Sequence, residues 1–263
     1  MSESIRYTVF TKPWKTMSMP ELAGHVSGLG FTGVEFPVRP EFQVEPDRVM
    51  EGLSEAAGIF ADHGVAIESV AGPYDEATIQ ACGEAGVPMI RICPAIDADG
   101  YWSTIDRLKA EFEQLQPVLA ASGVAIGIQN HCNNFISSAH AIMDLIGDYS
   151  PDQFCAVWDP AHNVLSGEIP EQAIDIFGTH LRMVNFKSPV WLRQNGPEAA
   201  RAQWRMYWTS GREGIAPWEK AVALLQERGW TGPATLCAEY SDHDSVDRLI
   251  ADDIAFAKEL FGG

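Results

Sequence analysis

The sequence predicts a single (β/α)8 TIM barrel that spans residues 1–263. Three observations lead to this prediction. Eight short apolar runs rich in β-branched residues alternate with eight helical patterns. The length of 263 residues is close to the roughly 250 that is typical of this fold. No linker, low-complexity tract or charge block divides the chain. Apolar strands separated by helices indicate a parallel sheet that is covered outside and closes on itself.

The predicted strands are residues 5–11, 33–37, 65–72, 88–94, 124–131, 154–160, 181–189 and 234–241. The predicted helices are residues 20–29, 46–63, 75–85, 103–121, 138–149, 170–177, 217–228 and 245–260. Several helices begin with Pro in the first turn and end at a Gly followed by an apolar residue, as at Gly64. An open doubly wound sheet usually carries a Gly-rich loop after its first strand. Here Thr11-Lys12-Pro13-Trp14 follows, which favours the barrel.

The composition of the chain argues against nucleic-acid and membrane partners and against a membrane-spanning or secreted protein. The net charge is −18 and the sequence pI about 4.6, so the surface repels nucleic acids and anionic membranes. The five cysteines are an odd number and contain no CxxC pair, which is typical of reduced thiols. No apolar run approaches the 18 residues of a membrane span, and the first residues lack the apolar stretch of a signal peptide. We expect a soluble cytoplasmic protein.

One long connection, residues 190–215, follows the seventh predicted strand and is dense in Trp and Arg. A long loop in a compact domain is usually functional. We therefore expect a lid-like loop over the barrel mouth, where Trp would stack on a sugar ring and Arg would bind hydroxyls or a carboxylate. The alternative is a loop that packs on the barrel rim.

Polar side chains collect at the predicted strand ends, which is where catalysis occurs in this fold. They are Glu35, Glu68, Arg91, Gln129, Asn130, His131, Asp159, Asn185, Lys187 and Glu239. Since side chains alternate faces along a strand, the apolar neighbours of Gln129, Asp159 and Glu239 are consistent with polar groups that point into the mouth. A lone carboxylate at one strand end is usually structural, but seven strands that share the feature indicate a functional site at the mouth.

Among the seven histidines, His131 and His162 lie at the expected mouth, whereas the other five fall in helices or at loop edges and are expected to be ordinary surface or capping residues. Arg91 has two interpretations. It either binds a substrate carboxylate or phosphate, or it pairs with Glu68 on the neighbouring strand.

The chain resembles the xylose-isomerase-like barrels of the sugar isomerase/epimerase superfamily. The motifs that carry the resemblance are Gly33-Val34-Glu35, Gln129-Asn130-His131, Asp159-Pro160-Ala161-His162-Asn163, Asn185-Phe186-Lys187-Ser188, Gly211-Arg212-Glu213-Gly214 with Pro217-Trp218, and Ala238-Glu239-Tyr240. Each motif alone is weak, but six occur in the right order on the right strands. The resemblance implies a small polyhydroxylated, sugar-like substrate and a substrate contact by His162. Together with the strand-end residues and these motifs, the expected substrate-binding residues are Glu35, Glu68, Arg91, His162, Lys187 and Arg212.

The resemblance also implies a divalent metal, commonly Mn, Mg or Co, held by a Glu on strand 5, an Asp after strand 6, a His on strand 7 and a Glu on strand 8. Asp159 and Glu239 match two of these positions, but the other two hold Gln129 and Asn185. Four oxygen donors suit Mg²⁺ or Mn²⁺ better than Zn²⁺, and neutral amides bind cations less well than carboxylates. We expect a site that takes Mg²⁺ or Mn²⁺ weakly, or takes only water.

Three function hypotheses follow. The first is a sugar isomerase or epimerase that transfers a proton next to a carbonyl. Because Gln129 cannot exchange a proton near neutral pH, Glu239 would be the principal base, with His131, His162 or Lys187 as its substitute partner. The second is a lyase on a keto-inositol or keto-glycoside, for which a single base suffices. The third is a non-catalytic sugar-binding descendant or partner subunit. Barrels of this family often pair, so a homodimer or other homo-oligomer is also expected.

Overall fold

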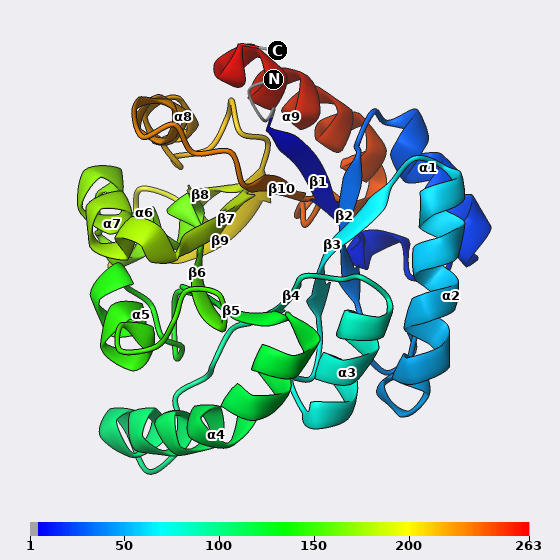
Figure 1. Ribbon diagram of the computed structural model, residues 1–263. Helices are drawn as coiled ribbons and strands as arrows, with labels where there is room; N and C mark the ends of the chain where they lie inside the picture. The colour runs from blue at the N-terminus through cyan, green and yellow to red at the C-terminus, as the bar shows by residue number, and fades with distance from the viewer. Residues whose placement is uncertain (1–4, 263) are drawn as a thin grey trace.

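The computed structural model describes residues 5–262 and contains a closed barrel of parallel strands (Figure 1). The strands are β1 (Arg6–Phe10), β2 (Gly33–Pro37), β3 (Ala66–Ala71), β4 (Met89–Ile92), β5 (Ala125–Gln129), β6 (Phe154–Trp158), β7 (Leu181–Phe186) and β10 (Pro233–Cys237). Their order around the barrel is β1-β10-β7-β6-β5-β4-β3-β2. The predicted (β/α)8 fold is therefore confirmed.

Helices surround the barrel and cover the outside of its strands (Figure 1). They are α1 (Met19–Gly28), α2 (Val49–Asp62), α3 (Glu76–Glu84), α4 (Tyr101–Ser122), α5 (Ala139–Ile146), α6 (Pro160–Ser166), α7 (Pro170–Phe177), α8 (Trp218–Glu227) and α9 (Val246–Phe261). Short 3₁₀ turns occupy Lys12–Trp14, Pro46–Arg48, Gly178–His180 and His243–Ser245. The sequence missed α6, because its first residue was assigned to the end of a strand.

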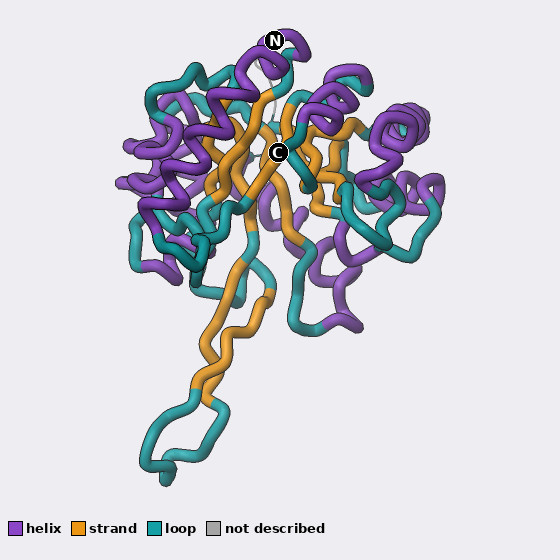
Figure 2. Tube along the Cα trace, turned by 90° about the horizontal axis from the view of Figure 1, so that it is seen from below, coloured by secondary structure: helices purple, strands orange, loops and turns teal. Residues whose placement is uncertain are grey.

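The predicted loop at 190–215 is largely a β-hairpin. Strands β8 (Ser188–Arg193) and β9 (Trp204–Thr209) pair antiparallel. Figure 2 shows that the hairpin projects away from the barrel and does not fold over the mouth. Strand β9 reaches the site described below through Arg205, Met206 and Trp208, whereas the tip does not cover the mouth in this conformation.

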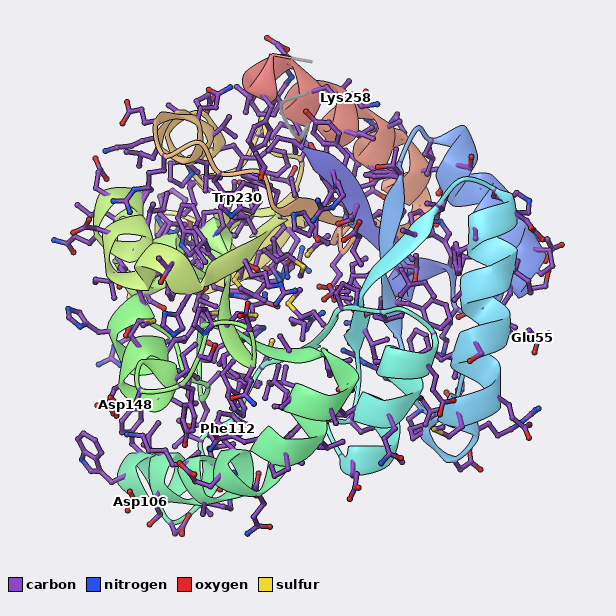
Figure 3. The ribbon with its side chains drawn as sticks, in the orientation of Figure 1. Glu55, Asp106, Phe112, Asp148, Trp230 and Lys258 are labelled. Carbon is purple, nitrogen blue, oxygen red and sulfur yellow. The ribbon has the colours of Figure 1, made fainter. Side chains whose placement is uncertain are left out.

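The helices bury apolar faces against the strands and expose acidic residues. Phe112 on α4 is fully buried and stacks on Phe154 of β6, with ring centroids 4.5 Å apart. Glu55, Asp106 and Asp148 lie on the outer surface (Figure 3). This division supplies the packing that holds the barrel, since each buried large apolar side chain contributes roughly 1.5–3 kcal/mol.

Side chains also fill the barrel interior. Met89, Ala125, Cys155, Val157 and Met183 form one buried cluster from β4, β5, β6 and β7. Alternation along the strand places Cys155, Val157 and Asp159 on one face. Cys155 and Val157 indeed lie in this interior layer, below the mouth. Because this layer closes the barrel, a ligand can enter only from an end.

No helix within residues 5–262 combines the length and the apolar character that a membrane span requires.

A buried carboxyl joins three segments at the rim of the mouth. Asp253 of α9 is 2% exposed. It accepts hydrogen bonds from the Tyr240 hydroxyl (2.7 Å) and from the backbone N–H of Gly211 (2.8 Å). Burial raises the pKa of Asp253 from 3.8 to about 6. The folded protein therefore holds this proton more tightly than the unfolded chain does.

This pKa shift predicts a pH-dependent stability. Between pH 4 and 6 the Asp253 carboxyl is protonated in the native state but mostly ionised in the unfolded chain. Its contribution to the free energy of unfolding is therefore present at low pH and is lost as pH rises through 6. The loss amounts to at most about 3 kcal/mol. In Asp253→Asn the side chain cannot ionise, so we expect urea denaturation to show a smaller fall in stability from pH 4.5 to 7.5 than in the wild type.

The control is Glu55→Gln, which changes an exposed carboxyl on α2 and should keep the wild-type dependence. Identical pH dependence in Asp253→Asn and the wild type would contradict the assignment.

Candidate active site

Two adjoining cavities occupy the carboxyl-terminal mouth of the barrel. The deeper one, about 310 Å³, is lined among others by Lys12, Arg39, Arg91, Gln129, Asn185 and Glu239. The outer one, about 590 Å³, shares Lys12, His131, Lys187 and Glu239 with it and is also lined by Trp208 from the base of the hairpin. Both cavities are at or above the lower size limit typical of small-molecule sites.

A chain of hydrogen bonds links Asp159, Gln129 and Asn185 below the mouth. Asp159 is fully buried and caps α6, because its Oδ1 accepts from the backbone N–H groups of Ala161 (3.0 Å) and His162 (3.1 Å). Its Oδ2 accepts from Gln129 Nε2 at 2.9 Å, and Gln129 Oε1 accepts from Asn185 Nδ2 at 3.0 Å. Burial raises the pKa of Asp159, while Lys187 and the two backbone N–H groups favour its ionised form. As a carboxylate Asp159 only accepts, so Gln129 presents its N–H₂ to the carboxylate and its oxygen to Asn185.

Two lysines, Lys187 and Lys12, lie beside the carboxylate of Glu239. Lys187 is 6% exposed, and its Nζ lies 3.5 Å from Asp159 Oδ2 and 3.7 Å from Glu239 Oε2. Lys12 Nζ lies 2.5 Å from Glu239 Oε1. Burial alone would raise the pKa of Glu239, but Lys187, Lys12 and Arg91 outweigh burial and lower this pKa to about 2. Glu239 is therefore a carboxylate throughout the physiological range.

The same balance keeps Lys187 charged. Burial alone would lower the pKa of Lys187, but the Asp159 carboxylate outweighs burial and the net shift is upward. The ammonium also lies over the ring of Trp208, 4.8 Å from its centroid. Lys187 is thus a permanent cation that faces the cavity between two carboxylates.

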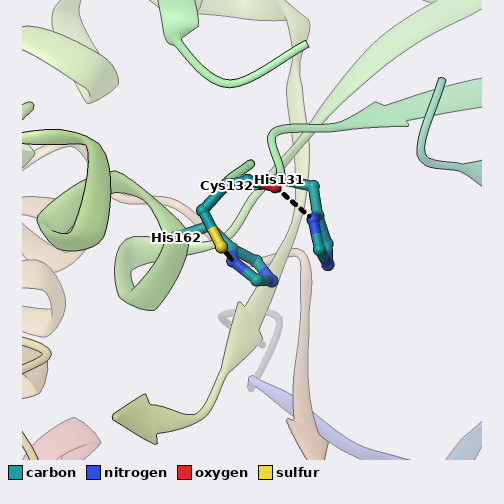
Figure 4. A group of neighbouring side chains, drawn as sticks. All are labelled: His131, Cys132 and His162. Atoms are coloured by element: carbon teal, nitrogen blue, oxygen red, sulfur yellow. Dashed lines mark hydrogen bonds between the residues drawn. The ribbon is translucent and has the colours of Figure 1, made fainter. Parts of the chain in front are cut away.

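The rings of His131 and His162 lie against each other at the mouth, tilted by 38°, with centroids 3.8 Å apart (Figure 4). His131 Nδ1 lies 2.8 Å from the carbonyl oxygen of Cys132. A carbonyl only accepts, so Nδ1 carries the proton and Nε2 is left as an acceptor in the neutral ring. Burial lowers the pKa of both histidines. Both rings are therefore neutral near pH 7.

His131, Cys132 and His162 also bring their ligand atoms within 4.8 Å of one another, close enough to hold a metal ion. Nitrogen and sulfur donors suit Zn²⁺ rather than the Mg²⁺ or Mn²⁺ expected from the sequence. His162 is fully buried, its Nδ1 lies 3.2 Å from Cys132 Sγ, and its Nε2 has no hydrogen-bond partner.

Arg91 pairs with Glu35 rather than with Glu68. The Arg91 Nε and Nη2 groups donate to Glu35 Oε1 (2.6 Å) and Oε2 (2.8 Å), and both side chains are buried. Removing one partner of such a pair costs about 3–5 kcal/mol, since it leaves a buried charge. Glu35 is fully buried and lines neither mouth cavity, so it acts by holding Arg91 at the cavity wall.

Two residues expected to bind substrate lie elsewhere. Glu68 pairs with Arg6 at 3.0 Å and lines a cavity at the amino-terminal end of the barrel, on the opposite side from the mouth. Arg212 pairs with Glu259 and lies over the ring of Phe256, 4.1 Å from its centroid. Neither side chain lines the mouth cavities in this structure, so the arrangement does not support the expected substrate contacts of these two residues.

The four positions that the resemblance assigns to metal ligands do come together, but their chemistry does not fit a divalent cation. The oxygen of Gln129 is used by Asn185 and its N–H₂ is turned toward Asp159. The two carboxylates, Asp159 and Glu239, share the ammonium of Lys187. Asn185 Oδ1 is a buried oxygen without a hydrogen-bond partner, but a divalent cation placed between the two carboxylates would meet the fixed positive charge of Lys187.

Three residues of the site were not singled out from the sequence: Lys12, Arg39 and Cys93. Each follows a barrel strand, β1, β2 and β4 respectively, which is the signal that could have identified them. Cys93 Sγ lies 3.5 Å from Gln129 Oε1 and 3.4 Å from Arg91 Nη1.

Solved structures share this fold over nearly the whole chain. D-psicose 3-epimerase from Clostridium cellulolyticum H10, with D-tagatose, has a TM-score of 0.73 and 14% identity, covering 98% of this chain and 99% of that one. The probable 3-DHS dehydratase AsbF from Bacillus anthracis has 0.71 and 14%, covering 95% and 98%. The 3-keto-D-glucoside 4-epimerase YcjR from E. coli has 0.71 and 13%, covering 97% and 100%. At these identities the likeness establishes the fold alone.

No curated protein sequence matches the chain. A family model described as "Xylose isomerase-like TIM barrel" matches residues 24–260. This match covers most of the chain and confirms the resemblance drawn from the strand-end motifs: the chain belongs to the xylose isomerase-like TIM barrel family.

Proposed function

We propose that this protein is an enzyme that isomerises a sugar or keto-sugar by moving one proton next to a carbonyl group. The observation that carries the proposal is the pair of Glu239 and Lys187 at the wall shared by both mouth cavities. One supplies an ionised carboxylate and the other a fixed cation. That is the combination required to form and stabilise an enolate.

In the proposed reaction, Glu239 removes the proton from the carbon that bears a hydroxyl next to the carbonyl. The C–H electrons form a carbon–carbon double bond, and the carbonyl oxygen becomes an enolate oxygen that the Lys187 ammonium stabilises. The free Nε2 of His131 carries the hydroxyl proton across to this oxygen. Glu239 then returns its proton to the former carbonyl carbon, which moves the carbonyl by one position. No step is assigned to a metal ion.

The arrangement supports single-base chemistry rather than two-base epimerisation. A two-carboxylate epimerase needs a proton-transfer group on each side of the carbon. Here the second position is Gln129, whose amide is held between Asp159 and Asn185 and cannot accept a proton. One base can shuttle a proton between adjacent carbons on one face of the substrate, which is sufficient for isomerisation.

A second candidate is elimination of water from a keto-sugar, and the contact between Lys12 and Glu239 favours it. After Glu239 takes the proton, the β-hydroxyl leaves with a proton from the Lys12 ammonium, which gives an unsaturated ketone and water. Glu239 then passes its proton back to Lys12 across their 2.5 Å contact. Atoms and charges balance, and again only one carboxylate is needed.

Glu239→Gln tests the base directly. Since the amide cannot take the proton, we expect kcat to fall by roughly 100- to 10,000-fold, while substrate affinity changes by only a few fold. The measurement is steady-state kinetics and direct binding on the first substrate that the wild type converts from a panel of ketoses, aldoses and keto-inositols. The control is Glu227→Gln, an exposed carboxylate at the end of α8, which should keep wild-type turnover.

Full turnover by Glu239→Gln would contradict the proposal and move the base to His131 or His162. The product separates the two candidate reactions, because isomerisation keeps the mass of the substrate whereas elimination loses one water. Gln129→Glu provides a further check: restoring a second carboxylate should not raise the rate of a reaction that uses one base.

A further inference from the structure

The wall of the deeper cavity carries an arginine without an anionic partner. Arg39 follows β2 and is half-buried, and its Nε donates to the carbonyl oxygen of Ala71 at 3.2 Å. No carboxylate within residues 5–262 lies at ion-pair distance from it. Its guanidinium lies 5.6 Å from the centroid of the Phe10 ring, and Arg91 lies 5.0 Å from the same centroid. The two arginines therefore share one aromatic side chain.

The charges around this cavity do not cancel. Its lining includes four cationic side chains and one carboxylate, although the whole chain has a net charge of −18. Three of the cations have partners: Arg91 has Glu35, Lys12 has Glu239, and Lys187 shares Asp159 and Glu239. Arg39 is the cation left over. Burial and the charge of Arg91 lower its pKa, as expected for a guanidinium that lacks an anion.

We propose that this cavity binds a substrate with an anionic group, a carboxylate or a phosphate, and that Arg39 is the residue that selects it. The terminal N–H groups of Arg39 make no hydrogen bond to described residues, and a guanidinium fork matches either anion in bidentate geometry. This inference deepens the proposed function, because it replaces a neutral sugar with a sugar acid or sugar phosphate. Arg39 also belongs to the wall that both the deeper cavity and a neighbouring outer groove share, so the anion can enter from solvent.

Binding without turnover tests this inference. Titration calorimetry at low salt compares D-glucuronate, D-glucose 6-phosphate and D-glucose on the wild type. We expect at least one anion to bind at least tenfold more tightly than D-glucose, and the better of the two identifies the anionic group. Arg39→Gln should remove that preference, and Arg39→Lys should retain part of it because the charge stays but the fork is lost. Arg48→Gln, an exposed arginine outside the cavities, should bind as the wild type does.

Equal affinity for all three probes, or an unchanged anion preference in both Arg39 variants, would overturn the inference. The result is independent of the proposed reaction. If the Glu239→Gln variant loses turnover but still prefers the anion, both proposals are supported. If this variant prefers the anion and keeps full turnover, only the role of Glu239 as the base is wrong.

A different observation concerns the hairpin, defined here as residues 188–209. In the antiparallel register Trp191 opposes Met206, and Trp204 opposes Arg193, which places Trp191, Trp204 and Met206 on one face. Trp191 is 51% exposed and Trp204 is 58% exposed. Trp208 lies on the same face at the base. An isolated two-stranded hairpin is marginally stable in water, so two large exposed rings on a projecting hairpin indicate a surface that is covered in use.

The charge of the hairpin favours an acidic partner. It contains three arginines (Arg193, Arg201 and Arg205) and one acidic residue, Glu198, for a net charge of +2. Because the whole chain carries −18, the other residues carry −20. We infer that the hairpin docks on a second copy of this chain, whose surface is complementary in charge. At the base, Trp208 contacts the His162 ring (centroids 5.5 Å apart) and Lys187, so docking is connected to the active site.

Sedimentation velocity at low and high salt tests this interface. We expect the wild type to form a dimer or higher homo-oligomer that weakens as salt rises, and Trp191→Ser/Trp204→Ser to be monomeric. Trp102→Ser removes a still more exposed ring at the start of α4, 69% exposed, and should remain associated. A monomeric wild type at every concentration, or unchanged association of the double variant, would show that the hairpin face is not this interface.

Discussion

The ammonium of Lys187, held between the carboxylates of Asp159 and Glu239, is the interaction on which the site depends. Three fixed charges lie together at the end of the barrel, and each sets the state of the others. Lys187 keeps Glu239 ionised, and Asp159 keeps Lys187 charged despite its burial. In turn, Asp159 is fixed by its role as the cap of α6 and by the amide of Gln129. The backbone of one helix thus positions the cation that faces the substrate.

A second buried pair, Glu35 with Arg91, orders the other side of the mouth. Between the two pairs the deeper cavity is positive, although the protein as a whole is strongly acidic. Such local reversal of charge requires buried or hydrogen-bonded cations, because solvent screens exposed ones. The outer surface and the site therefore differ in their electrostatics: the surface is strongly acidic, whereas the positive site would, under the proposed function, attract anions or stabilise developing negative charge.

The sequence predicts the barrel and the strand ends that form its mouth, because period and strand length are local properties. It does not predict side-chain direction where the register is irregular. The pairing of β2 with β3 shifts between Val34 and Glu35, and the extra residue on β3 is Glu68. Simple alternation therefore fails there, and Glu68 faces the other end of the barrel. The direction of the Gln129 amide depends on Asp159, thirty positions away, and Lys12 reaches the site only because β1 pairs with β10. These contacts are tertiary and leave no local pattern.

The most direct test of the central claim is a crystal of the wild-type protein soaked in MnCl₂ and measured at the manganese absorption edge. The account predicts no anomalous peak between Asp159 and Glu239, with the Nζ of Lys187 in that place and Gln129 still donating to Asp159. A manganese peak bound by these two carboxylates, with Lys187 turned away, would contradict it.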